Sequence, residues 1–337
     1  MRGIYWLVEL TLLATILLIS SCGDKPCGED IDIQNIDVNV EIERLEDEFF
    51  ELTTAEEAIT FLDENPVLSE AFYQRSQFPN DSILVNKLLS LAGSPYLDTM
   101  RREVDTLFGE LTDIRASFEG AFRRIKYYYP EFQPPEIKTI ITGLGDGSDL
   151  YISPELIIIG LDWFLGEAGS YAPNNIPQYI KQRLTKDYLV PSCIMFLSDP
   201  FNATALEDKT MLAEMLYFGK AYAFTKEMMP CISDSLILGY SGQQIKEINF
   251  NQERIWGHFV DESLLYETNH FVKVKYLNER PNVPEIGDKC PGRIARWLGW
   301  QVIQNYRKKS DIGFVDLMKE VDAGEIFRQS KYRPTPH

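Results

Sequence analysis

One helix-length segment with almost no charge constrains the fold of this chain most strongly. Residues 210–225 carry only two charged side chains, Glu214 and Lys220. A helix that is apolar on nearly every face belongs in a protein interior, so other elements must cover it. A carboxylate there must be paired, hydrogen-bonded or protonated, because an isolated buried charge is very costly. We therefore expect Glu214 to pair with Arg293 or Arg296; the alternative is that Glu214 faces solvent at a rim.

The segments before and after this helix predict an α+β fold that is mostly helical, with a small central sheet. Apolar residues at spacings of three and four predict helices over residues 41–129. Thr54 is a suitable cap for a helix over residues 55–65, and residues 97–128 read as one or two longer helices. After residue 134, β-branched runs predict strands at 137–142, 149–152 and 156–160.

The glycine-rich segment 143–148 lies between the first two expected strands. It matches neither the GxxxxGK[ST] nor the GxGxxG phosphate-binding pattern, so a hairpin turn is the favoured interpretation. Further helices are expected at 176–186, 206–229, 242–266 and 291–309. Ser241 is a suitable cap for the third of these, and Pro291 suits the first turn of the last.

The N-terminus has the pattern of a lipoprotein signal peptide. Residues 10–19 are an almost unbroken apolar run, the length of a signal-peptide core and shorter than a membrane-spanning helix. The sequence Ile19-Ser20-Ser21-Cys22 follows, with small residues before a cysteine. We therefore predict cleavage before Cys22 and attachment of lipid to its thiol. An ordinary secretory signal with a chance cysteine, or a buried first helix, is the alternative.

Charge is distributed unevenly along the chain. The net charge of −18 argues against nucleic acid as a partner, because phosphates require clustered Lys and Arg. Residues 24–70 hold 16 acidic side chains against Lys25 and Arg44. Acidic charge next to a lipid anchor is repelled by anionic head groups, so we interpret the segment as a hydrated tether rather than a partner-binding patch.

These observations divide the chain into five regions. We expect a signal peptide at residues 1–21, an acidic lipid-anchored linker at 22–40 and a helical region at 41–133. An α+β region follows at 134–332, and a tail at 333–337. The apolar content of 45% is that of a folded protein rather than a disordered one.

Four cysteines remain once Cys22 carries lipid: Cys27, Cys193, Cys231 and Cys290. An even number in an oxidising compartment permits two disulfides, with three possible connectivities. No CxxC pair occurs, which argues against a thiolate zinc site. Cys193 lies in an apolar stretch and is expected to be a buried thiol, so Cys231 with Cys290 is the first pairing to test.

No familiar catalytic pattern is present in the sequence. The three histidines, His258, His270 and His337, form no HExxH motif, and GxSxG is also absent. Each histidine is interpreted as structural or solvated rather than metal-bound. The sequence thus predicts no metal and no cofactor.

Several short motifs in order resemble the GldB family of gliding-motility lipoproteins from Bacteroidetes. The resemblance covers residues 40–332, and Leu45 departs from it because an aromatic residue is expected there. Its motifs are Glu43-Arg44 with Phe49-Phe50, residues 125–130 (IKYYYP), 157–163 (IIIGLDW), 212–220 (LAEMLYFGK), 255–259 (IWGHF), 291–301 (PGRIARWLGWQ) and 325–332 (EIFRQSKY).

That family is in turn distantly similar to predicted zinc metallopeptidases, which carry HExxH on a buried helix behind a small sheet. On this comparison Ala213 and Tyr217 occupy the two histidine positions and Glu214 keeps the position of the general base. A zinc site needs the two imidazoles, one helical turn apart. The resemblance implies a peptidase-like scaffold with a degenerate site at Glu214 and Tyr217, without the metal centre.

The resemblance implies a lipid-anchored, non-enzymatic protein of the cell envelope that is required for gliding and linked to type IX secretion. Its expected partners are the membrane, through the lipid, and other motility or secretion proteins. Its folded part is expected outside the cytoplasm. The alternative is a hydrolase that uses Glu214 as acid or base in the same cleft.

Overall fold

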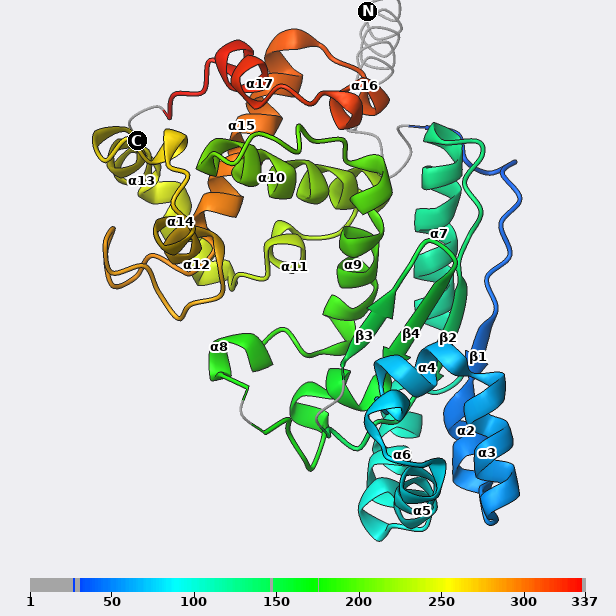
Figure 1. Cartoon of the computed structure of the whole chain (residues 1–337). Coiled ribbons are helices and arrows are strands. Elements are labelled where there is room, and N and C mark those ends of the chain that lie inside the picture. Colours follow the sequence, from blue (N-terminus) through cyan, green and yellow to red (C-terminus); the bar gives the residue numbers. More distant parts are fainter. Residues whose placement is uncertain (1–26, 28–30, 146–147, 175, 335–337) are drawn as a thin grey trace, which may run out of the picture. The chain divides into compact units, whose positions relative to one another are not determined.

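The computed structural model describes residue 27 and residues 31–145, 148–174 and 176–334 (Figure 1). The chain divides into two compact units, Met1–Asp32 and Ile33–His337, and the second holds all the elements below. The expected signal peptide and Cys22 lie outside the described residues. Val38 and Val40, at the end of the expected linker, are buried in the core of the second unit.

A four-stranded mixed sheet forms in the order β1-β2-β4-β3. The strands are β1 (Ile42–Arg44), β2 (Glu136–Ile140), β3 (Leu150–Ile152) and β4 (Leu156–Gly160). β1 and β4 run parallel to β2, and β3 runs antiparallel to β4. β4 is apolar along its length and buried from its second residue on, as a strand covered on both faces must be. The expected α+β class, mostly helical with a small sheet, is confirmed.

Two details of the sheet differ from expectation. The segment 143–148 is not a hairpin turn, because β2 and β3 are not neighbours; the hairpin joins β3 to β4. β1 forms where a helix was expected. It is fixed by the fully buried Glu46, whose carboxylate accepts hydrogen bonds from Arg44 Nε (2.8 Å) and from Thr139 Oγ1 on β2.

Seven helical segments lie between β1 and β2: α2 (Leu45–Glu51), α3 (Ala55–Glu64), α4 (Pro66–Ala71), the 3-10 helix η1 (Arg75–Gln77), α5 (Asp81–Ala92), α6 (Pro95–Phe108) and α7 (Thr112–Tyr128). Thr54 caps α3 as expected, because its hydroxyl accepts from Glu57 N while the Glu57 side chain accepts from Thr54 N. The expected span 97–128 is two helices, separated at Gly109 and Leu111, both of which have positive φ.

The remaining helices follow the sheet: η2 (Leu161–Phe164), η3 (Gly166–Ala168), α8 (Gln178–Lys181), α9 (Lys186–Leu197), η4 (Asp199–Phe201), α10 (Met211–Met228), α11 (Asp234–Leu238), α12 (Gly242–Phe250), α13 (Gln252–Asp261), η5 (Leu264–Tyr266), α14 (His270–Leu277), α15 (Ile294–Ser310), α16 (Phe314–Lys319) and α17 (Ala323–Ser330).

Ser241 caps α12 as expected, but the single helix expected over 242–266 is interrupted at Asn251. There the side-chain amide of Asn251 donates to Glu247 O and ends the first helix.

α15 begins three residues later than the sequence suggested. Gly292 packs against the backbone of Arg280, where an added Cβ would lie 2.3 Å from the Arg280 carbonyl oxygen. Arg293 then takes a left-handed conformation, with φ +61°, and the helix starts at Ile294. Pro291 therefore belongs to the preceding turn rather than to the first helical turn.

The apolar side chains form two clusters, and α10 contributes to both. One surrounds the sheet with α2–α7 and α9, and it includes Phe224 and Met228 from the end of α10. The other surrounds α15 with α11–α14 and α17, and it includes Met211 and Met215 from the start of α10. Figure 1 shows α10 running between α9 and α15. The position expected of the most apolar segment, at the centre of the body, is confirmed.

Candidate functional site

The residues singled out from the sequence lie on α10, whose N-terminus is capped by Thr210. Its hydroxyl accepts from Ala213 N at 3.2 Å and donates to Asp208 at 2.7 Å. Most of the helix is buried, as expected of a segment that is apolar on nearly every face. Glu214, in its first turn, is only partly buried, with a side chain 43% exposed.

The partner of Glu214 is Lys273 on α14, not an arginine. The Lys273 amine donates to the Glu214 carboxylate and to the Lys209 carbonyl. Lys273 is buried, so the pair joins a buried cation to a carboxylate at the edge of the helix. The sequence did not single out Lys273, because it alternates with Lys275 in a short helix and carries no distinguishing pattern.

The expected pairing of Glu214 with Arg293 or Arg296 is therefore wrong. Arg293 Nε lies 3.2 Å from a carboxylate oxygen of Glu279, and Arg296 Nε donates to Leu277 O at 2.6 Å. Arg296 also places its guanidinium 3.9 Å from the centre of the Phe218 ring. Both arginines are held by residues at the end of α14 and just beyond it, and neither forms an ion pair with Glu214.

α10 and α15 nevertheless pack together as expected, and they cross at two glycines. A Cβ added at Gly299 would lie 1.9 Å from Met215 O, and one added at Gly219 would lie 2.6 Å from the Gly299 backbone. Contacts this short leave no room for any side chain. Helix packing at glycine lets two backbones approach more closely than ordinary side chains permit.

Tyr217 is the residue that the sequence comparison aligns with the second histidine of an HExxH motif. Its hydroxyl donates to Asp199 at 2.7 Å; burial, followed by this hydrogen bond and the Asp199 charge, raises the pKa of Tyr217. Ala213 fills the position of the first histidine and offers no ligand atom. The side chains at positions 213, 214 and 217 are thus a methyl group, a carboxylate paired with lysine and a protonated phenol.

A cavity of about 650 Å³ lies beside Tyr217. Residues of β3, α9, α10 and α15 line it, among them Ile152, Phe196, Phe218 and Arg296. Glu214 is not among them. The structure therefore separates the two residues expected to form the site: Tyr217 reaches the cavity, and Glu214 faces α14.

Lys220, the other charged residue within 210–225, is buried, and its described hydrogen bonds all go to carbonyl groups. Its amine donates to Ala203 O at 2.5 Å, to Glu320 O at 2.9 Å and to Met318 O at 3.4 Å. Burial lowers the pKa of Lys220 to about 8, and the Glu320 charge opposes this shift. The lysine ties the loops before α10 and after α16 to the centre of the molecule.

The two histidines that the structure describes, His258 and His270, form no cluster with other potential ligands in the described ranges. His258 Nε2 lies 2.9 Å from the Tyr276 hydroxyl, and His270 is exposed at the start of α14. His337 lies outside the described residues. In the described ranges, no group of three His, Cys, Asp or Glu side chains is placed to hold a metal ion.

The cysteines differ from expectation in one respect. Cys193 is a buried free thiol, as expected, but so is Cys290, and the pairing of Cys231 with Cys290 is therefore wrong. Cys231 and Cys27 are each disulfide-bonded.

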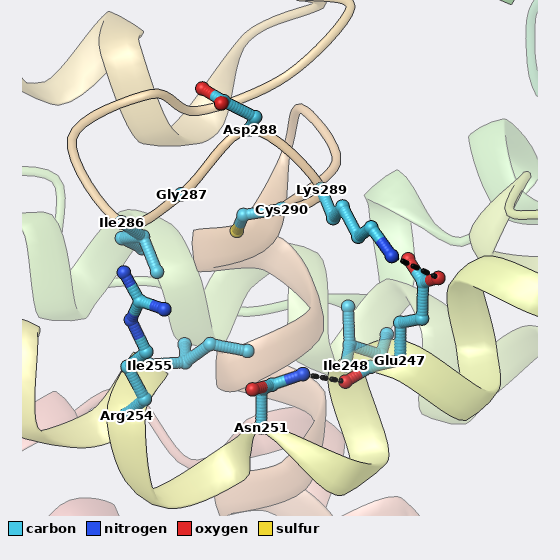
Figure 2. A pocket seen from close by; sticks show the side chains of 10 residues that line it. All are labelled: Glu247, Ile248, Asn251, Arg254, Ile255, Ile286, Gly287, Asp288, Lys289 and Cys290. Carbon is cyan, nitrogen blue, oxygen red and sulfur yellow. Dashed lines mark hydrogen bonds and ion pairs between the residues drawn. The ribbon is translucent and has the colours of Figure 1, made fainter.

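Figure 2 shows Cys290 at a hollow of about 450 Å³ between α12, α13 and the loop before α15. Lys289 reaches across it toward Glu247, at 3.8 Å. Burial raises the pKa of the Cys290 thiol to about 12, although the charge of Arg254 opposes the shift. Because only a thiolate is a good nucleophile, this hollow has no reactive cysteine at neutral pH.

None of the helices in the described ranges is both long and apolar enough to cross a membrane.

Comparison with known proteins gives one match. A family model described as gliding motility protein GldB matches residues 26–334. No curated protein and no solved structure matches the chain significantly. The match includes every strand and helix described above, from β1 to α17. The chain therefore belongs to the GldB family of gliding motility proteins.

Proposed function

We propose that this protein is a lipid-anchored component of the cell envelope that is required for gliding, is linked to type IX secretion and acts without catalysis. Membership of the GldB family supports the role in motility. The sequence Ile19-Ser20-Ser21-Cys22 after an apolar run supports the anchor. The partners are the membrane, through the lipid, and other motility or secretion proteins.

The observation that carries the non-enzymatic proposal is the state of the degenerate motif. Glu214 is in an ion pair with Lys273, and the Tyr217 hydroxyl is bonded to Asp199. A general base must reach the group whose proton it takes, but the Glu214 carboxylate faces α14 and does not line the cavity beside Tyr217. The contacts of both residues support structural roles.

The alternative, a hydrolase using Glu214, makes a different prediction for the same variants. Glu214→Gln keeps an acceptor for Lys273 but removes the negative charge, which should cost about 1–2 kcal/mol of stability. Tyr217→Phe removes only the hydroxyl. If the two residues are structural, gliding should fall only as far as protein abundance falls. Loss of gliding at normal abundance and normal melting temperature would favour the hydrolase.

The anchor has its own test. Cys22→Ala should abolish metabolic labelling with palmitate and displace the protein from the membrane fraction, with loss of gliding. Cys290→Ala, at a buried free thiol, is the matched control and should label normally. Equal labelling of the Cys22→Ala variant would refute the anchor. Export of type IX cargo, measured in the same strains, tests the link to secretion and should fall with gliding.

A further inference from the structure

Three arginines line a second, smaller cavity of about 200 Å³ on the same side of α15. Arg183 follows α8, and Arg293 and Arg296 lie at the start of α15. The chain as a whole carries a net charge of −18, so a concentration of cations in one hollow is unusual for it. Such a hollow attracts anions, because low-dielectric walls strengthen the field of the charges that line it.

Two of the arginines share one carboxylate. Glu279 accepts from Arg183 Nη2 at 2.9 Å and lies 3.2 Å from Arg293 Nε. Arg293 Nη2 also donates to Gly239 O at 3.1 Å. The side chains of Arg183 and Arg293 are 19% and 9% exposed, so both charges are largely withdrawn from water. One carboxylate neutralises only half of this pair.

The third arginine has no acidic partner among the described residues. Arg296 Nε donates to Leu277 O, and its two Nη groups have no described hydrogen bond and remain available as donors at the cavity. Arg183 Nε is buried and also has no hydrogen-bond partner within the described ranges. A buried donor without a partner, such as Arg183 Nε, is costly, and an incoming acceptor removes that cost.

The charges around the cavity leave a surplus. Its lining contains three guanidinium groups and two carboxylates, Glu279 and Asp149. Burial lowers the pKa of Arg183, and the nearby charge of Arg293 lowers it further. One positive charge therefore remains without a counterion, and a ligand with a single negative charge would neutralise it.

The cavity adjoins the larger one beside Tyr217, and the two share part of their lining. Asp149, Leu150, Met195, Phe196 and Arg296 line both. Phe196, which lines both, is 57% exposed and presents an apolar surface there. The combined hollow therefore has a cationic end and an apolar wall.

We propose that this hollow binds a carboxylate carried on an apolar body. Arg296 and Arg183 donate to the carboxylate, and the apolar body lies against Leu150, Met195 and Phe196. A carboxylate fits better than phosphate because its single negative charge matches the single surplus positive charge; the planar fork of a guanidinium can bind either oxyanion. Free organic acids and the carboxyl-terminal ends of polypeptides share this chemistry.

The test measures binding of small probes to the purified full-length lipoprotein in detergent, by calorimetry or ligand-observed NMR. N-acetyl-L-leucine presents a carboxylate on an apolar body, and N-acetyl-L-leucine amide is the same body without the charge. Hexanoate represents a free organic acid, and inorganic phosphate represents a different oxyanion. The two carboxylates should bind, and the amide and phosphate should bind at least about tenfold more weakly.

Variants of Arg296 link the binding to the site. Arg296→Gln should weaken carboxylate binding by about tenfold or more. Arg296→Lys keeps the charge but not the planar fork, so its affinity should lie between those of the wild type and Arg296→Gln. Arg102→Gln is the matched control, since this arginine on α6 has a side chain 70% exposed and does not line the hollow. The melting temperature of each variant shows whether the protein remains folded.

Each possible result of these binding measurements either contradicts or supports the proposal. Equal binding of acid and amide, tighter binding of phosphate, or unchanged affinity in a folded Arg296→Gln variant would overturn the proposal. So would the absence of binding by either carboxylate at about 10 mM. Tighter binding of N-acetyl-L-leucine supports the proposal with polypeptide ends as the source, and tighter binding of hexanoate supports it with free acids.

Discussion

The contact between α10 and α15 gives a sharp test of how the centre of the molecule is assembled. In Gly299→Ala, the new methyl group would lie 1.9 Å from Met215 O, and the adjacent carbonyl carbon would lie 2.5 Å away. Carbon and oxygen normally approach to about 3.3–3.6 Å, so the two helices would have to separate by roughly 1.4 Å. Both opposing atoms belong to the backbone and cannot rotate away.

The magnitude follows from two opposing effects. Overpacking a core costs about 1–3 kcal/mol and occasionally more, and a backbone clash this short belongs at the upper end. Alanine is a better helix former than glycine by about 1 kcal/mol, which offsets part of the loss. We expect Gly299→Ala to reduce the free energy of unfolding by at least about 2 kcal/mol.

Gly120→Ala on α7 is the matched control, because a Cβ at Gly120 meets nothing within 4 Å. That variant should gain about 0.5–1 kcal/mol from helix propensity alone. Urea denaturation of the purified proteins, followed by circular dichroism, measures both changes. If Gly299→Ala is as stable as Gly120→Ala, the close approach of the two helices is refuted.

The remaining predictions concern metal, pH and thiols. Purified protein should hold no stoichiometric zinc and cleave no generic peptide; elemental analysis finding about one zinc per chain, lost when His258 is mutated, would contradict this. Burial lowers the pKa of Lys220 to about 8, below its unfolded value, so the unfolded state binds the extra proton and stability should rise with pH above 8. Between pH 8 and 9.5, the free energy of unfolding of the wild type should rise by about 2 kcal/mol more than that of Lys220→Met, as measured by chemical denaturation. If the free energies of the two proteins change with pH in parallel, the prediction is wrong. Cys193 and Cys290 are buried free thiols, so iodoacetamide at pH 8 should label neither in the native protein and both after denaturation, as mass spectrometry would show.

Elements with local signals could be predicted from the sequence. The cap at Thr54, the β-branched runs of β2 and β4 and the low charge of α10 each specify their structure within a few residues. β1 could not be predicted in this way. It has three residues, and it is a strand only because β2 and the buried Glu46 hold it in place.

The partner of Glu214 shows why the site was harder to predict than the fold. The sequence indicated correctly that α10 and α15 pack together, but it did not specify how one helix is rotated about the other. That rotation is set by the glycine contact at the crossing and by the left-handed turn at Arg293. As a result, Arg293 pairs with Glu279 and Arg296 donates to Leu277 O. Glu214 pairs with Lys273 instead.

The position of β1 also determines the order in which the molecule can assemble. Ile42 pairs with Ile137, and all the helices from α2 to α7 lie between them in the chain. Helices depend on local contacts and form quickly, whereas a strand pairing between distant segments must first close the intervening loop. A chain that emerges amino end first presents β1 well before β2, so the first strand has no partner until the helical region has emerged. The edge of the sheet is therefore completed late, and the buried carboxylate of Glu46 stays hydrated until that step.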